Sequence, residues 1–511
     1  MRTVFRSFLP IALASIVLLS CNDFLAVDSK RGASEGQQWE TLEDTRAALM
    51  GVYGLMRAAL AENNTHWICG DLRMGDFTSH NRGDIQCVIN SELSKPHALL
   101  TGVSNWRRFY AVINAAAVFI EKAPRTVELD RSYSAQNLEY DIAQARAIRA
   151  FAYFYMVRIW GDVPLVTYSY DNGSFPALYR SGAQTVLNYA KVELLAAAQE
   201  LPYQFGTSAN RYYGLVGADW RGVLFNKLSV YSILAHISAW EGNYAETETY
   251  AAYVLNHASE IFASYVSIAD LTSARGLFYA NTVVERRGSR IVGFNFRHSD
   301  NEATQSGHIE QLTLAFPLVQ RTYPEIFVSK DSLFSIFNDA DDIRFGVDAN
   351  LNYYTNYVHN LNAEIPIFSK IKVVQDGDAK DNDFGVFGSS ILFTRLEDVA
   401  LLRAEALCAL NRSEEAITYL NVIRANRGLK ELLFKKDLEN SPERLLNAVF
   451  EERRKELMGE GWRWYDLIRR QRLMKDNEKL LQLINNGGIY WPIAEDVIAA
   501  NRQIEQNAYW K

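Results

Sequence analysis

The stretch "EERRKELMGEGWRWYDLIRR" (residues 451–470) mixes acidic and basic residues with two tryptophans and one tyrosine. Apolar residues recur at helical spacing through and before it, which predicts a helix over 443–473 with apolar rows on two sides. A helix enclosed on two sides buries Glu452 and Glu456, and buried carboxylates are costly unless cations pair with them. We therefore expect a structural ion-pair network here, and its predicted members are Arg149, Glu452, Arg453 and Glu456. The alternative is a general acid/base pair, since two carboxylates four residues apart share one helix face.

Helical periodicity dominates the rest of the chain. Two segments, "ISAWEGNYAETETYA" (237–251) and "ALCALNRSEEAITYL" (406–420), superimpose at a constant offset, with small residues where two helices of a hairpin would meet. This pattern is typical of tetratricopeptide-like hairpins that stack and share a core. Further helices are predicted over 41–61, 104–123, 137–160, 182–200, 219–257 and 396–427.

Two stretches, 62–100 and 258–395, lose this periodicity and are rich in Gly, Asn, Asp, Ser and aromatic residues. Short β-like runs occur at 290–296 and 391–394. Long irregular segments on a rigid scaffold are usually functional. The predicted fold class is mainly α: tetratricopeptide-like hairpins forming a right-handed superhelical scaffold, with a loop-rich, minor-β ligand-binding face.

The N-terminus predicts export. Arg2 and Arg6 precede an apolar run that is too short to span a bilayer, and the run ends in Leu-Leu-Ser-Cys. This resembles a bacterial lipobox, so we expect a signal peptide over 1–20, lipidation of Cys21, a tether over 21–40 and one folded domain over 41–511. The alternative is an ordinary signal peptide that happens to carry a cysteine.

The totals exclude some classes of partner and cofactor. The net charge is −7, which argues against nucleic acid. Cys69 and Cys87 could form a disulfide, which the sequence leaves open, and no cysteine spacing indicates zinc. The segment 376–385 resembles a calcium loop only in its first half, because Lys380 stands where an oxygen ligand is needed. We expect no metal and no cofactor.

The 511 residues are 12% aromatic, and aromatic side chains beside planar polar groups suit sugar rings. Three loop segments combine the two. The ligand-binding candidates are Trp67, Arg73, Asp76, His80, Asn81 and Arg82 in the first segment, Phe294, Asn295, Phe296, Arg297 and His298 in the second, and Tyr353 and Tyr354 in the third.

The order of motifs along the chain resembles the SusD/RagB family of outer-membrane nutrient-binding lipoproteins. The matching segments include the lipobox with "CNDFL", "ARAIRAFAYFYMVRIWGDVPLV" (145–166), "LEDVALLRAEALCAL" (396–410), "VFEERRKELMGEGWRWYDLIR" (449–469) and "YWPIAEDVIAANRQIEQNAYW" (490–510). The resemblance implies a lipid-anchored protein that faces the cell exterior. It also implies a SusC-like TonB-dependent transporter as partner, a glycan or, in some members, a peptide as ligand, and no catalysis.

Two readings from other classes remain open at the level of sequence. One is a tetratricopeptide assembly scaffold without a small-molecule ligand. The other is a glycan hydrolase, which needs two carboxylates facing each other across a cleft.

Overall fold

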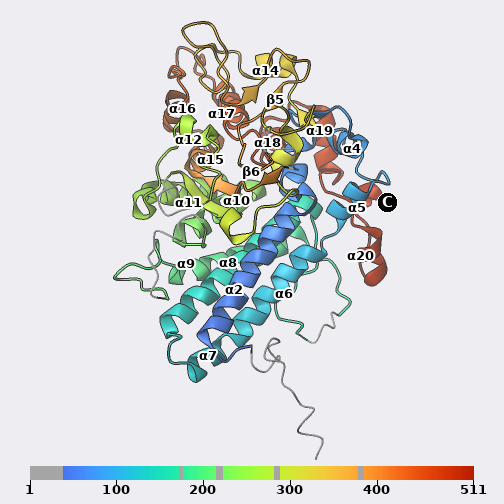
Figure 1. The fold of residues 1–511 in the computed structure, drawn as a ribbon, viewed down its shortest axis with the longest axis vertical. Coiled ribbons are helices and arrows are strands. Elements are labelled where there is room, and N and C mark those ends of the chain that lie inside the picture. Colours follow the sequence, from blue (N-terminus) through green and yellow to red (C-terminus); the bar gives the residue numbers. More distant parts are fainter. Residues whose placement is uncertain (1–37, 172–175, 214–222, 281–287, 378–384) are drawn as a thin grey trace, which may run out of the picture.

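The computed structural model describes residues 38–171, 176–213, 223–280, 288–377 and 385–511. The predicted signal peptide, Cys21, residues 21–37 of the tether and most of the segment with a partial calcium-loop pattern lie outside these ranges. The fold is mainly helical with short strands, as the sequence predicts (Figure 1). Within the described residues, no helix combines the length and the apolar character that a bilayer crossing requires.

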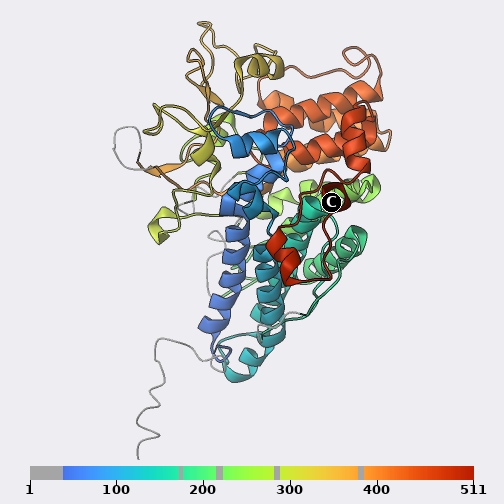
Figure 2. The same ribbon diagram turned by 90° about the vertical axis from the view of Figure 1, so that its right-hand side faces the viewer.

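Long helices form most of the lower half of the molecule in Figures 1 and 2. They are α2 (Leu42–Ala61), α6 (Arg107–Lys122), α8 (Ala135–Trp160) and α9 (Ala183–Glu200), and α8 packs against both α6 and α9. Residues 147–160 of α8 are all buried, which agrees with a sequence that is apolar on nearly every side. Helix α8 therefore forms the centre of this bundle.

Two helical hairpins continue the array. Helices α10 (Lys227–Glu241) and α11 (Tyr244–Asn256) form the first, and α15 (Leu396–Ala409) and α16 (Ser413–Asn426) form the second. Their turns are the same: Asn243 N donates to Ser238 O, and Arg412 N donates to Leu407 O at the same sequence offset. The residue directly before each donor has a left-handed backbone conformation, with φ 82° at Gly242 and 61° at Asn411. Because α11 also packs against α15, the two hairpins stack directly.

The single helix predicted over 443–473 is wrong. The structure has α17 (Pro442–Glu456) and α18 (Arg463–Met474), separated by a turn. Gly459 and Gly461 adopt φ 77° and 81° there, a left-handed conformation that ends a helix and favours glycine. Two glycines close together therefore outweigh the apolar periodicity on either side of them.

In the part of the irregular stretches that the structure describes, the strands form four two-stranded antiparallel ladders: β1–β3, β2–β8, β4–β5 and β6–β7. The β-like runs predicted at 290–296 and 391–394 become β2 (Arg290–Phe294) and β8 (Ile391–Arg395), which pair with each other and are wholly buried. The other strands are β1 (Thr78–Ser79), β3 (Ile326–Phe327), β4 (Val358–His359), β5 (Ile367–Phe368), β6 (Val374–Asp376) and β7 (Val386–Phe387).

Short helices connect these parts and close the C-terminal end. They are η1 (Glu62–Asn64), α3 (Thr65–Trp67), the π-helical turn η2 (Ile68–Leu72), α4 (Gly83–Ile89), α5 (Ala98–Ser104), α7 (Pro124–Leu129), η4 (Ala258–Ile261), α12 (Ile268–Thr272), η6 (His298–Asp300), α13 (Ile309–Thr313), α14 (Lys330–Ile336), α19 (Glu478–Asn485), α20 (Glu495–Ala500) and η7 (Ala508–Trp510). Cys69, Cys87 and Cys408 are free thiols, so the pairing that the sequence left open does not form.

Candidate functional site

A cleft of about 750 Å³ lies where the two irregular stretches meet the C-terminal end of α2. Residues from α2, from the segment after it and from the segment after β2 all contribute to its walls. It is lined by Gly54, Arg57, Ala58, Ala61, Glu62, Asn63, Asn64, Ile68, Arg82, Ile85, Leu99, Phe296, Asn301, Glu302, Thr304, Ser306, Gly307, Gln311 and Leu312. The lining is mixed, with amides, hydroxyls and charged groups beside apolar side chains.

The end of α2 shapes one wall. Asn63 and Asn64 are both left-handed, with φ 55° and 52°. Asparagine tolerates this conformation better than most residues, but two in succession are uncommon and costly. The reversal turns the chain out of α2 and brings both asparagine residues to the cleft.

An ion pair crosses the cleft. Arg57 Nη1, on α2, lies 2.6 Å from Glu302 Oε1 and donates to Asn295 O at 2.7 Å. The Arg57 guanidinium also lies over the Phe296 ring, 5.0 Å from its centroid. The backbone N–H of Arg297 donates a hydrogen bond to Glu302 Oε2 at 3.0 Å. A planar cation, a carboxylate and an aromatic ring therefore converge on one point.

A smaller pocket of about 310 Å³ adjoins the cleft and shares Gly54, Arg57 and Glu302 with it. Of the sequence-predicted ligand residues, the cleft and this pocket together bring five to one place: Arg82, Phe294, Asn295, Phe296 and Arg297. Phe294, Asn295 and Phe296 are more than nine-tenths buried, so they form the floor and support of the site instead of an exposed platform.

Arg82 forms the other end of the cleft. Its Nε and Nη2 donate to Asp84 at 2.8 and 2.7 Å, and Nη1 pairs with Glu325. The side-chain hydrogen bonds to Asp84 contribute most to raising the pKa of Arg82. His80 and Asn81 beside it are exposed, and the His80 ring lies 6.0 Å from that of Tyr323.

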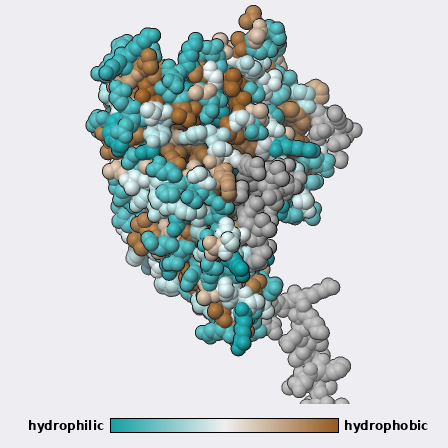
Figure 3. Space-filling model, turned by 90° about the vertical axis from the view of Figure 1, so that its left-hand side faces the viewer, coloured by the Kyte–Doolittle hydropathy of each residue, from teal (hydrophilic) through white to brown (hydrophobic). Residues whose placement is uncertain are grey.

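A second pocket, of about 610 Å³, contains Tyr353 and Tyr354. Tyr353 is 45% exposed and stacks on Phe345, with ring centroids 5.3 Å apart. Phe334, which is 43% exposed, lies 5.8 Å from both rings. Phe334 and Tyr353 therefore make an exposed aromatic patch, which the buried Phe345 ring supports from below. The upper half of the face in Figure 3 likewise shows apolar patches between polar ones.

The structure corrects the prediction for Trp67 and Arg73, which belong to the interior, and Asp76 is partly buried and lies outside the cleft and the pockets. Trp67 is buried and donates from Nε1 to Gly459 O at 3.2 Å. Arg73 is fully buried, donates to Ile489 O at 2.8 Å and lies over the Trp464 ring. The Asp76 side chain pairs with Arg454 and Arg463. These residues hold the turn between α17 and α18 against the rest of the fold. His298, in contrast, is exposed on η6 and lines neither the cleft nor the two other pockets.

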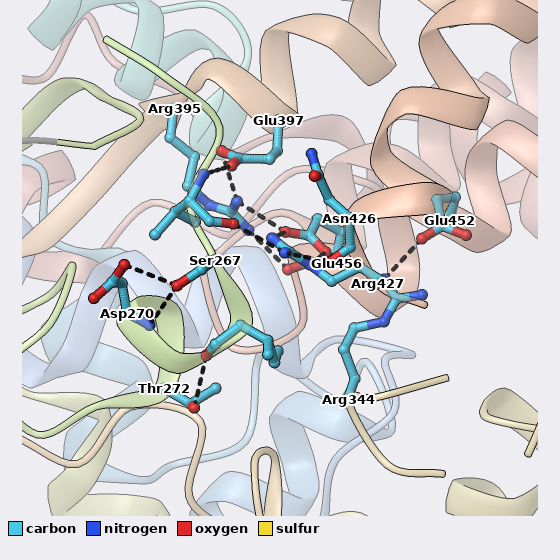
Figure 4. Close-up of polar contacts among 12 residues, drawn as sticks. Ser267, Asp270, Thr272, Arg344, Arg395, Glu397, Asn426, Arg427, Glu452 and Glu456 are labelled. Atoms are coloured by element: carbon cyan, nitrogen blue, oxygen red, sulfur yellow. Dashed lines mark hydrogen bonds and ion pairs between the residues drawn. The ribbon is translucent and has the colours of Figure 1, made fainter. Parts of the chain in front are cut away.

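Glu452 and Glu456 lie in a buried cluster of ion pairs (Figure 4). Glu456 contacts Arg427, Arg395 and Arg344, and Glu452 contacts Arg344 at 2.8 Å. Burial alone would raise the pKa of Glu456. The Arg427 and Arg395 guanidinium groups outweigh that effect and hold the pKa well below its usual range. A carboxylate fixed in its charged form among arginines is poorly suited to donate a proton.

The other predicted members of this network have different partners. Arg453 pairs with Asp398 and Asp466, both at 2.9 Å. The prediction for Arg149 is wrong: Arg149 lies on α8 and pairs with Glu193 of α9, so it does not belong to the cluster around Glu452 and Glu456. The sequence contains many arginines that could pair with a buried glutamate. Residue spacing within one helix does not predict which arginine of another helix makes the pair.

The sequence reasoning missed Arg57, Asn64 and Gln311 in the cleft. Arg57 lies in a regular helix, where its spacing gives no sign of a ligand site. The one available signal was the Asn63-Asn64 pair directly after the Ala-rich end of α2, since asparagine is enriched in left-handed turns.

Comparison with known proteins gives a consistent result. A model of the SusD family matches residues 353–510. SusD-like protein P38 of Formosa agariphila is 26% identical over 96% of this chain and 96% of its own length. The crystal structure of a SusD superfamily protein from Bacteroides thetaiotaomicron is 69% identical, covers 93% of this chain and 100% of its own, and superposes with a TM-score of 0.87. A structure named "Laminarin binding SusD-like protein" shares the fold at 19% identity and a TM-score of 0.68, covering 92% of this chain and 99% of its own.

Proposed function

The chain belongs to the SusD/RagB family, and on that premise we propose that it is a surface-exposed, non-catalytic lipoprotein that binds oligosaccharide or polysaccharide. It delivers this ligand to a SusC-like TonB-dependent transporter in the outer membrane. The observation that carries the proposal is the cleft at the end of α2, where residues from both loop-rich stretches converge.

The chemistry of the cleft supports a sugar ligand. Sugar hydroxyls are bound by planar side chains that donate and accept hydrogen bonds, and Arg57, Glu302, Asn64 and Gln311 are of this kind. The Phe296 ring and the apolar side chains nearby suit the C–H faces of a sugar ring. The exposed patch of Phe334 and Tyr353, backed by the buried Phe345, offers a second surface for a long chain of sugars.

The acids of the cleft favour binding over catalysis. Glu302 is paired with Arg57, and Glu62 is paired with Arg108 at 3.1 Å. Glu452 and Glu456, the pair that suggested acid/base chemistry, are enclosed by arginines away from the cleft. Hydrolysis of a glycan by this chain is therefore not proposed.

Isothermal titration of the purified protein against a glycan panel tests the proposal, with laminarin included because one structural relative is named for binding it. We expect at least one glycan to bind, and Arg57→Met to weaken that binding about tenfold, as expected for one or two lost hydrogen bonds. Arg125→Met removes an exposed arginine elsewhere and serves as the control. Binding to peptides and to no glycan would move the function to the peptide-capturing alternative.

The anchor and the partner are proposed from the sequence motif and the family. Cys21→Ala is expected to release the protein from the membrane fraction. Without the cysteine no lipid is attached, and the acyl chains that would hold the protein on the membrane are absent. Copurification of the wild-type protein with a TonB-dependent transporter is expected. Copurification with periplasmic proteins alone would favour the assembly-scaffold alternative.

A further inference from the structure

The wall of the cleft contains a buried hydrogen-bond acceptor that has no partner. Asn64 is 7% exposed, lines the cleft and donates from Nδ2 to Gln311 Oε1 at 3.0 Å. Its Oδ1 has no hydrogen-bond partner among the described residues. A buried acceptor left unpaired is costly, so native proteins rarely keep one without a reason.

The orientation of both carboxamides follows from one backbone group. Gly307 N donates to Gln311 Oε1 at 3.1 Å. Because a backbone N–H can only donate, the atom facing it must be the oxygen of Gln311. Asn64 must then present Nδ2 to that oxygen, which leaves Asn64 Oδ1 as the unpaired atom. Gln311 Nε2, for its part, makes no hydrogen bond within the described part of the chain.

The positive charges of the cleft are already engaged. Arg57 and Arg82 are the cationic residues among those that line it. Arg57 is paired with Glu302, and Arg82 is paired with both Asp84 and Glu325. An anionic ligand would have to compete with these carboxylates and would meet Glu62, Glu302 and the unpaired oxygen of Asn64. A hydroxyl group meets no such opposition, because it can donate to Asn64 Oδ1 and accept from Gln311 Nε2.

We propose that this cleft selects neutral, hydroxyl-rich glycans over glycans that carry carboxylate or sulfate groups, and that Asn64 and Gln311 determine this specificity by binding sugar hydroxyls. The inference rests on the proposed function, since it specifies the ligand of the same cleft.

Titrations of the full-length protein in detergent with neutral glycans (laminarin, mannan, amylopectin) and acidic ones (alginate, polygalacturonate, a sulfated galactan) test the selection. We expect a neutral glycan to bind and the acidic ones to bind at least tenfold more weakly. An acidic glycan that binds as tightly or more tightly overturns the inference while leaving glycan capture standing. Failure of every glycan to bind overturns the proposed function, and this inference with it.

Two variants test the residues. Gln311→Glu keeps the oxygen that accepts from Gly307 and Asn64, but loses the free Nε2 donor and adds a negative charge. Asn64→Gly removes the acceptor and keeps a residue that adopts positive φ without strain. We expect each to weaken neutral-glycan binding about tenfold. Gln136→Glu, an exposed change of the same type on α8, should not change the affinity. Unchanged affinity in both cleft variants, with their thermal unfolding intact, would overturn the assigned role, and so would an equal loss in the control.

Discussion

Arg427 and Glu456 form a two-point ion pair in the protein interior. Nη2 of Arg427 lies 2.7 Å from Oε1 of Glu456, and Nε lies 2.8 Å from Oε2. Both side chains are fully buried. Arg427 stands at the C-terminal end of α16 and Glu456 is the last residue of α17, so the pair joins the second hairpin to the motif that follows it.

Replacement of Arg427 by Leu is expected to lower the free energy of unfolding by about 3–5 kcal/mol. The reason is that Glu456 loses its two-point partner and keeps only Arg395 and Arg344, and a buried charge that has lost part of its compensation costs more than the net contribution of the intact pair. Urea denaturation followed by circular dichroism measures the change.

Arg444→Leu is the matched control for this substitution. Arg444 pairs with Glu439 on the surface, where the two side chains are 52% and 69% exposed. Exposed pairs contribute about 0–1 kcal/mol, so the control should be nearly neutral. A similar loss in both variants would contradict a special role for the buried cluster.

Gly459→Ala tests the turn that separates α17 from α18. A Cβ atom there would lie 2.6 Å from Phe368 Cε1, and φ is 77°. Because positive φ costs an L-residue about 1–2 kcal/mol and the contact adds to it, we expect a loss of at least about 2 kcal/mol in thermal or urea unfolding.

Gly51→Ala is the control for that glycine. Gly51 lies within α2, and a Cβ atom there would meet nothing within 4 Å. Since alanine is the better helix former, this change should raise the free energy of unfolding by about 0.5–1 kcal/mol. The two substitutions are expected to change the free energy of unfolding in opposite directions, and a loss at both would argue against this explanation.

Glu310 gives the protein a pH-dependent stability. It is fully buried on α13, accepts from Ser389 Oγ at 2.7 Å and Val373 N at 3.1 Å, and shares Ser389 with His308. Burial raises the pKa of its carboxyl from 4.5 to about 7. Between these values the folded state holds more protons than the unfolded state, so the free energy of unfolding falls as pH rises. The contribution is fully present below pH 4.5 and is lost as pH rises through 7.

Glu310→Gln removes this titration while keeping the shape of the side chain. We expect the variant to match the wild type near pH 5 and to exceed its free energy of unfolding by about 2–3 kcal/mol at pH 8. Urea denaturation at several pH values measures the difference. The exposed Glu431→Gln should show no such trend, and a gap that is constant with pH would contradict the assignment.

The helical part of the fold could be predicted because its physical signals are local. The buried helix expected over 137–160 is α8 (Ala135–Trp160), and the two hairpins carry the same turn. The break after Glu456 is hard to predict because Gly459 and Gly461 lie inside a long pattern whose apolar residues keep helical spacing on both sides.

The cleft was harder to predict because its members are far apart in sequence. Arg57 and Glu302 meet through the packing of α2 beside the segment after β2, and no local pattern records that contact. Trp67 and Arg73 had the residue types of a sugar site, but residue type does not reveal burial. The loops could therefore be located from the sequence, while the direction of each side chain could not.

Tyr353 tests whether the aromatic patch takes part in binding. Its ring is 45% exposed and rests on Phe345 at an interplanar angle of 25°, so one face is supported and the residue is free to meet a ligand. We expect Tyr353→Ala to weaken binding of a long glycan about fivefold, corresponding to about 1 kcal/mol of stacking, with little change in stability. Tyr353→Phe should bind like the wild type, because stacking uses the ring and not the hydroxyl.

Tyr179, which is 72% exposed on another part of the surface, supplies the control Tyr179→Ala. A loss in Tyr353→Phe equal to that in Tyr353→Ala would assign the effect to a hydrogen bond, and equal binding by all three variants would confine the ligand to the cleft beside Arg57.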